Sequence, residues 1–139
     1  LDGKLYAMGG QNYDGGHHRL ISSVERYDLA TKSWEAVAPM EEARYDHAVA
    51  VLDGTLYAVG GHNEVDLSSV ERYDPALDAW EAVAPMPTAR AYHAVAVLDS
   101  KLYAVGGTNP NDGSLSSAER YDPALDVWEV VAPMAEARG

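Results

Sequence analysis

The chain has 139 residues, 47% of them apolar and 23% charged, which is typical of one folded domain with a packed core. Asp and Glu number 22 against 10 Lys and Arg, so the formal net charge is −12 at pH 7. A field of this sign repels phosphate groups, which predicts neither a nucleic-acid partner nor an anionic membrane partner. The absence of Cys excludes disulfides, thiolate metal sites and Cys nucleophiles. It does not indicate whether the chain works in a reducing or an oxidising compartment.

The first elements in chain order are a turn and a strand. Residues 1–5 repeat the pattern of residues 52–56, Leu-Asp-Gly-x-Leu, in which Asp-Gly predicts a type I′ turn because both central residues need positive φ. The chain is therefore expected to start between the first and second strands of a repeat. Gly9-Gly10 ends that second strand, since paired glycines permit positive φ and let a neighbouring backbone approach closely.

Internal repetition organises the rest of the chain. Residues 22–40, 68–86 and 116–134 are copies of one 19-residue segment; the second and third agree at 16 positions, the first and second at 15. Trp34, Trp80 and Trp128 are separated by 46 and 48 residues. A repeat of this length predicts one small sheet per copy, stacked on its neighbours.

The second copy shows four expected strands, which cover residues 47–52, 56–59, 69–73 and 79–83. Asp53-Gly54 predicts the first turn, Asp74-Pro75 predicts a later one, and Pro85 ends the last strand. Four short antiparallel strands joined by tight turns are one blade of a β-propeller. We expect the aromatic residues to fill the wide outer part of each blade. Small side chains suit the innermost strands, where blades converge: Ala48, Ala50, Ala94 and Ala96.

The third copy is followed by Ala137-Arg138, which matches Ala43-Arg44 and Ala89-Arg90 and so precedes an innermost strand. By this count the chain holds two complete blades and three strands of another, eleven strands in all. We predict a partial blade over residues 1–40, a blade over residues 41–86, and a blade plus the start of the next over residues 87–139.

Three markers recur in every copy: the Gly doublet, a Tyr, and a Trp seven positions beyond that Tyr. With these markers in phase, the whole chain resembles the Kelch-repeat β-propeller family. The resemblance implies an all-β fold of four-stranded antiparallel blades that close into a ring of about six. The chain then corresponds to half of a six-bladed ring whose first blade lacks its innermost strand.

The two end blades are each expected to expose an apolar face. If a face covers a few hundred Å2, exposing it costs roughly 10 kcal/mol. We therefore expect closure, either by the rest of a longer propeller or by a homodimer that completes a six-bladed ring with a two-fold symmetric contact.

Candidate binding residues lie in connections that differ between copies. Segments 11–21, 62–67 and 108–115 follow the Gly pairs, and segments 41–46 and 87–92 precede innermost strands. In Kelch proteins of the ubiquitin-ligase adaptor type both sets line one end of the ring, so the resemblance implies a protein or peptide partner there. An alternative is that variable loops reflect only loose constraint on solvated turns. The candidates form no Arg-rich pocket, and the acidic composition favours a basic or polar partner: Gln11, Tyr13, His17, His18, Arg19, Tyr45, Asp46, His62, Asn63, Glu64, Tyr92, Thr108 and Asn109.

Other residue groups are interpreted as structural. His47 and His93 are expected beside the central channel, bonded to water and without a metal, and residues 109–113 lack the spacing of a calcium loop. Neighbouring Glu and Arg on one strand point to opposite faces and cannot form one acid–base pair. We expect Arg26, Arg72 and Arg120 to bond across blades, and Asp28, Asp74 and Asp122 to bond their own turns.

The sequence thus predicts a non-enzymatic protein-interaction module without cofactor or metal. One alternative is a structural or model repeat protein that assembles with itself into a closed propeller and has no other ligand. A weaker alternative is a sugar-binding or sugar-processing propeller.

Overall fold

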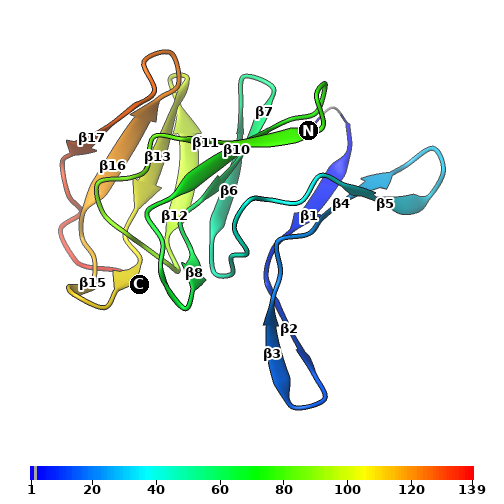
Figure 1. Ribbon diagram of the computed structural model, residues 1–139. Coiled ribbons are helices and arrows are strands. Elements are labelled where there is room, and N and C mark those ends of the chain that lie inside the picture. Colours follow the sequence, from blue (N-terminus) through cyan, green and yellow to red (C-terminus); the bar gives the residue numbers. More distant parts are fainter. Residues whose placement is uncertain (2) are drawn as a thin grey trace.

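The computed structural model describes Leu1 and residues 3–139; Asp2, part of the predicted first turn, lies outside the described residues. The described residues form strands and turns without a helix (Figure 1). Three antiparallel sheets stand side by side, and small two-stranded hairpins project from one end. This arrangement confirms the predicted all-β blade architecture.

Eleven strands build the three blades, and their grouping matches the sequence count. The first blade has three strands in the order β1-β4-β5, and the other two have four each, in the orders β6-β7-β10-β11 and β12-β13-β16-β17. Their bounds are β1 Leu5–Met8, β4 Val24–Asp28, β5 Ser33–Val37, β6 Ala48–Leu52, β7 Thr55–Val59, β10 Val70–Asp74, β11 Ala79–Val83, β12 Ala94–Leu98, β13 Lys101–Val105, β16 Ala118–Asp122 and β17 Val127–Val131.

Three hairpins interrupt the connections after the Gly pairs, where the sequence indicated only variable loops. They are β2 (Gln11–Asp14) with β3 (His17–Leu20), β8 (His62–Asn63) with β9 (Val65–Asp66), and β14 (Thr108–Asn109) with β15 (Gly113–Ser114). The longest hairpin turns at Gly15-Gly16, where φ is 56° and 88°, as a type I′ turn requires.

The apolar core lies between the blades. Along β7 the side chains alternate: Leu56 and Ala58 pack toward the first blade, and Tyr57 and Val59 toward the third. All four are buried because the middle blade has a neighbour on each side. The equivalent strands of the outer blades, β1 and β13, alternate between more and less buried residues, since each has only one neighbouring blade.

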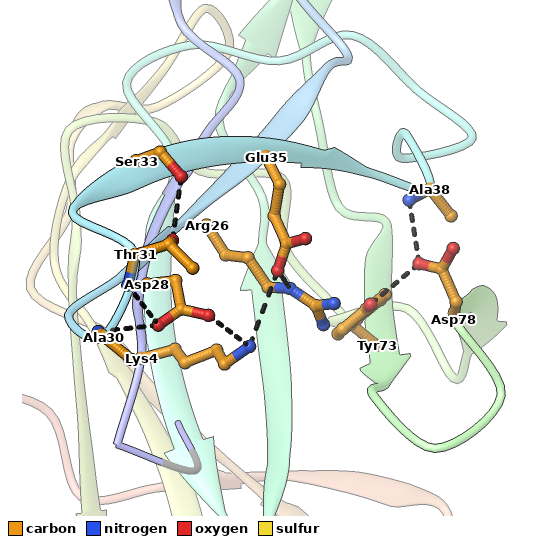
Figure 2. A network of polar contacts seen from close by, with 10 residues as sticks. All are labelled: Lys4, Arg26, Asp28, Ala30, Thr31, Ser33, Glu35, Ala38, Tyr73 and Asp78. Carbon is orange, nitrogen blue, oxygen red and sulfur yellow. Dashed lines mark hydrogen bonds and ion pairs between the residues drawn. The ribbon is translucent and has the colours of Figure 1, made fainter.

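Each seam between blades carries a repeated set of hydrogen bonds. Trp80 donates its indole N–H to the Ala38 carbonyl at 2.8 Å, and Trp128 does the same to Ala84 at 2.8 Å. Asp78 accepts from the Ala38 amide at 2.9 Å and from the Tyr73 hydroxyl at 2.8 Å (Figure 2). The Ala38 amide, followed by Tyr73, holds the pKa of Asp78 below its usual value.

A buried arginine crosses each seam at the end where the connections run. Arg44 donates from Nη1 to the Gly60 carbonyl at 2.8 Å and from Nη2 to Glu71 at 2.7 Å. Its own carbonyl accepts from the Gly10 amide of the first blade at 2.7 Å, so the residue joins the two blades. Arg90 repeats the contact with Glu119, at 2.9 Å.

The prediction that Arg26, Arg72 and Arg120 bond across blades is wrong. Each pairs with a Glu on the next strand of its own sheet, Glu35, Glu81 and Glu129, respectively. The Arg26–Glu35 pair, which Lys4 joins, is visible in Figure 2. The contact across the seam belongs to the neighbouring Glu of the same dipeptide, because alternate residues on a strand face opposite blades.

Three structural predictions hold. Asp28, Asp74 and Asp122 each accept a hydrogen bond from the amide two residues on, within their own turns. A Cβ on Gly60, whose φ is 61°, would lie 2.6 Å from the Arg90 carbonyl oxygen, so this Gly permits close backbone approach. The alanine-rich strands β6 and β12 lie side by side where the blades converge (Figure 1).

Candidate partner-binding face

The β8–β9 and β14–β15 hairpins meet the segments that lead into the innermost strands at one end of the blades. Tyr45, just before β6, exchanges backbone hydrogen bonds of 3.1 and 2.8 Å with His62 on β8. Ala91, just before β12, does the same with Thr108 on β14, at 3.0 and 2.9 Å. Both sets of variable connections are therefore adjacent (Figure 1), and we call this end the loop face.

Tyr92 is the most prominent side chain of the loop face. It is 63% exposed, and its backbone is left-handed with φ of 54°. A bulky residue rarely adopts this conformation, and such strain concentrates at functional positions. The equivalent residue in the preceding blade, Asp46, is also left-handed with φ of 52°, and its carbonyl accepts from the Tyr92 amide at 3.0 Å. Hydrogen bonding to the Asp46 carboxylate, together with its charge, raises the pKa of the Tyr92 hydroxyl.

A second polar group lies on β8 and β9. His62 Nδ1 is 2.5 Å from an Asp66 carboxylate oxygen, and the His62 ring stacks edge-on against Tyr45 with centroids 5.1 Å apart. The ring is therefore held between an aromatic face and a carboxylate. Tyr45, His62 and Asp66 therefore form a cluster next to Asp46 that offers an aromatic ring and a carboxylate acceptor to a ligand.

Two predicted site residues use their side chains for hydrogen bonds between loops. Asn63 donates its amide to the Ala43 carbonyl at 2.9 Å, and Asn109 donates to Ala89 at 3.1 Å. Asn109 also accepts from the amides of Asn111 and Asp112, which closes the turn of its hairpin. Both side chains fix loop shape, which leaves their neighbours as the accessible part of the face.

The remaining predicted residues do not all come together. Gln11, Tyr13, His17, His18 and Arg19 lie exposed on β2 and β3, and this hairpin extends away from the blades (Figure 1). The Tyr13 and His18 rings contact each other across it, with centroids 5.1 Å apart. Glu64 is exposed at the tip of the β8–β9 hairpin, with φ of 44°. The predicted set thus divides into a loop face and a separate arm.

A hollow of 410 Å3 opens between the hairpins of the second and third blades, and Asn109 is its one lining residue among the predicted site residues. The lining includes the carboxylates Asp66 and Asp112 together with Thr88 and Asn111. The volume lies in the range of small ligand sites. From the sequence, these four residues could be recognised only as members of variable segments. Their closeness could not be predicted, because Asp66 and Asp112 belong to different blades and come together only when the blades stack.

His47 and His93 each pack against the blade before them. Each is half-buried, and the His47 ring lies against Gly9 of the preceding blade, as the His93 ring lies against Gly60. Burial, followed by repulsion from Arg44 or Arg90, lowers the pKa of each His to about 4. Both rings are neutral at pH 7. Within residues 1 and 3–139, no group of three or more His, Asp or Glu side chains is placed to hold a metal ion.

A family model described as the Kelch motif matches residues 1–41, 43–87 and 89–135. The chain belongs to the Kelch family. Kelch-like protein 33 of Homo sapiens is 40% identical over 65 residues, which are 46% of this chain and 12% of that protein. Kelch-like protein 35 of Mus musculus is 48% identical over 61 residues, 44% of this chain and 10% of that protein.

A third relative of this Kelch chain is the Influenza virus NS1A-binding protein homolog of Xenopus laevis, 44% identical over 63 residues, which are 45% of this chain and 9% of that protein. Each match therefore covers only a short part of a much longer relative. The solved structure of YjhT superposes with a TM-score of 0.74 at 19% identity, covering 94% of this chain and 52% of that one. This likeness shows a shared fold. The described residues contain no helix long and apolar enough to cross a membrane.

Proposed function

We propose that the chain is a non-catalytic protein-interaction module that binds a basic peptide segment through the loop face. One observation carries the proposal: Tyr92 stands exposed in a strained conformation on a rigid scaffold, beside the carboxylate of Asp46. Exposed Tyr anchors contribute disproportionately to protein interfaces, because they offer a large contact area and a hydroxyl at low entropic cost.

The charge of the loop face supports a basic ligand. Asp46, Asp66 and Asp112 lie at this end, where Arg44 and Arg90 are buried in the seams and Arg138 is the exposed cation beside Tyr92. The net charge of −12 adds long-range attraction for a cationic segment. A Lys or Arg side chain would fit the hollow between the hairpins and pair with Asp66 or Asp112. Membership of the Kelch family, in which one relative is named for binding a protein, is consistent with this assignment.

A selection from a random peptide library displayed on phage tests the proposal. Selected peptides should be enriched in Lys and Arg, and Tyr92→Ala should weaken their binding by about tenfold or more, as expected for loss of an interface anchor. Leu77→Ala is the matched control, because Leu77 is also an exposed large side chain but lies in the β10–β11 turn at the opposite end. Affinities can be measured by fluorescence anisotropy with synthetic peptides.

The hollow is tested by the double change Asp66→Asn and Asp112→Asn, which keeps side-chain size and removes two charges. We expect binding of basic peptides to weaken and to lose part of its salt dependence. Peptides that bind Tyr92→Ala and wild type equally, or that lack any cationic preference, would contradict the proposal.

A further inference from the structure

We propose that the hollow between the hairpins of the second and third blades is an arginine pocket, which selects Arg over Lys in the basic segment that binds the loop face. This inference rests on the proposed function and names the side chain that the site takes. The β8–β9 and β14–β15 hairpins that bound the hollow lie at the same end of the molecule (Figure 1). Its volume of 410 Å3 is sufficient for one long side chain.

Asp66 contributes a carboxylate that is mostly buried and has one oxygen open to the hollow. Its side chain is 11% exposed, and its Oδ1 lies 2.5 Å from His62 Nδ1. Because an ionised carboxylate only accepts, His62 carries the proton on Nδ1 and holds the carboxylate in place. Within the described residues no hydrogen bond reaches Asp66 Oδ2. A carboxylate oxygen with so little access to water favours a ligand that donates to it.

Asp112 supplies a second carboxylate from the other blade. Its Oδ2 accepts from the Asn109 side-chain amide at 3.2 Å, and among the residues that the structure describes no hydrogen bond reaches its Oδ1. Asn109 also accepts from the Asp112 amide at 2.8 Å, so the carboxylate stands on a closed turn. Asp112 belongs to the connection of residues 108–115, which has eight residues against six in residues 62–67. Each hairpin therefore offers the hollow one carboxylate oxygen.

Apolar side chains form another part of the lining, namely Val65, Pro87 and Pro110. In the preceding seam the position of Pro87 is taken by Glu41, whose amide donates to the Glu71 carboxylate at 2.6 Å. Pro87 has no N–H to donate, and an apolar ring replaces an acidic side chain at this position. Apolar surface beside two carboxylates suits a side chain with a long aliphatic stem and a cationic head.

Acceptors on separate residues favour Arg over Lys. A guanidinium carries five N–H groups in a rigid plane, so it can donate to two carboxylates on different blades at once. The Thr88 hydroxyl donates to Glu119 at 3.1 Å and keeps its lone pairs for a further N–H of the ligand. An ammonium is a compact, strongly hydrated point charge with three donors, and it gives up more hydration on entering the hollow.

NMR titration of the isotope-labelled chain with short peptides tests the selection directly. The probes are acetyl-Gly-Arg-Gly-amide and acetyl-Gly-Lys-Gly-amide, which carry equal charge, and the citrulline analogue of the first, which is neutral and has nearly the same shape. The Arg peptide should shift the amide resonances of Asp66, Asn111 and Asp112 and bind about tenfold more tightly than the Lys peptide. The citrulline peptide should leave these resonances in place, because it lacks the charge.

Single substitutions connect the selection to the two carboxylates. Asp112→Asn should reduce the ratio of Arg to Lys affinity to about threefold or less, because its one remaining oxygen is used by Asn109. Asp66→Asn should act in the same way, since His62 uses the oxygen that remains there. Glu64→Gln is the matched control: it removes one charge from the β8–β9 hairpin at a residue outside the lining, and should leave the ratio unchanged. Circular dichroism of every variant checks that the blades remain folded.

Equal affinity for the Arg and Lys peptides, or an Arg peptide that leaves all three resonances in place, would overturn the arginine pocket. The proposed function would still stand if library peptides rich in Lys and Arg bind and depend on Tyr92. An Arg preference that Asp112→Asn and Glu64→Gln reduce equally would also contradict the pocket, because general charge would then explain it. A library without any cationic preference would end both proposals.

Discussion

His47 and His93 are neutral, half-buried rings at equivalent places in two blades, and their partial burial couples stability to pH. The pKa of each is about 4, below the ordinary value of 6.5. As the pH falls below 6.5, the two His side chains bind protons in the unfolded chain but stay neutral in the folded chain. The free energy of unfolding therefore decreases until about pH 4. Carboxylates with lowered pKa, such as Asp78 and Asp126, contribute to acid lability mainly at lower pH.

We predict that the free energy of unfolding falls between pH 7 and pH 4.5 and that His47→Gln combined with His93→Gln reduces this dependence. Each ring contributes up to about 3 kcal/mol to the change, because its pKa falls from 6.5 in the unfolded chain to about 4 in the folded one. Urea unfolding followed by circular dichroism at fixed protein concentration measures it. His17→Gln with His18→Gln, on the exposed hairpin, should leave the slope as it is. A double variant at residues 47 and 93 with the wild-type slope would refute the prediction.

The roles within each Glu-Arg dipeptide were predicted wrongly from the sequence, which assigned the bond across blades to the Arg. The sequence showed that Glu71 and Arg72 face opposite sides of a strand, but not which side met the preceding blade. The structure buries Glu71, whereas Arg72 pairs with Glu81 in its own sheet. The buried partner of Glu71 is Arg44, 27 residues away, and no local pattern links the two. Local turn bonds such as that of Asp74 were predictable because they join residues two apart.

At the scale of elements, the buried Arg–Glu pair fixes each connection between blades to the blade that follows it. Arg90 and Glu119 are both fully buried, and Arg90 also donates to the Gly106 carbonyl at 2.8 Å and the Ser117 carbonyl at 3.0 Å. Removing the guanidinium leaves the buried Glu119 carboxylate with the Thr88 hydroxyl as its remaining side-chain donor, at 3.1 Å, and takes a donor from two carbonyls. Such a loss is far more costly than breaking an exposed ion pair.

We predict that Arg90→Met destabilises the chain by about 3 to 5 kcal/mol. Arg120→Met is the matched control: it breaks the exposed pair with Glu129 and should cost less than about 1 kcal/mol. Adding Glu119→Gln to Arg90→Met should recover part of the loss, because it removes the uncompensated charge. Equal destabilisation by the two single variants, in urea titrations at the same protein concentration, would show that the buried pair has no special role.

The blade strands were predictable and the hairpins were not. Alternating apolar residues and Asp-Gly turns define the strands of the second blade within a residue or two of their observed bounds. The β8 and β9 strands have two residues each, too few for a periodicity to appear. The loop face was foreseen through family resemblance, whereas the hollow beside Asp66 and Asp112 depends on how two blades stack.

At the scale of the whole molecule, the net charge of −12 acts on a charged partner at long range. It attracts the cationic segment that we propose for the loop face, and salt screens this attraction beyond about 8 Å at physiological ionic strength. The Arg–Glu pairs beside the seams are screened much less, because Arg44, Glu71, Arg90 and Glu119 are buried.

Raising the salt concentration should therefore weaken the binding of basic peptides while changing the free energy of unfolding much less. Fluorescence anisotropy measures the first quantity and urea unfolding the second, in the same buffers. Peptide binding that is indifferent to salt would contradict the electrostatic part of the proposed function, because the charge of the loop face would then contribute nothing to it.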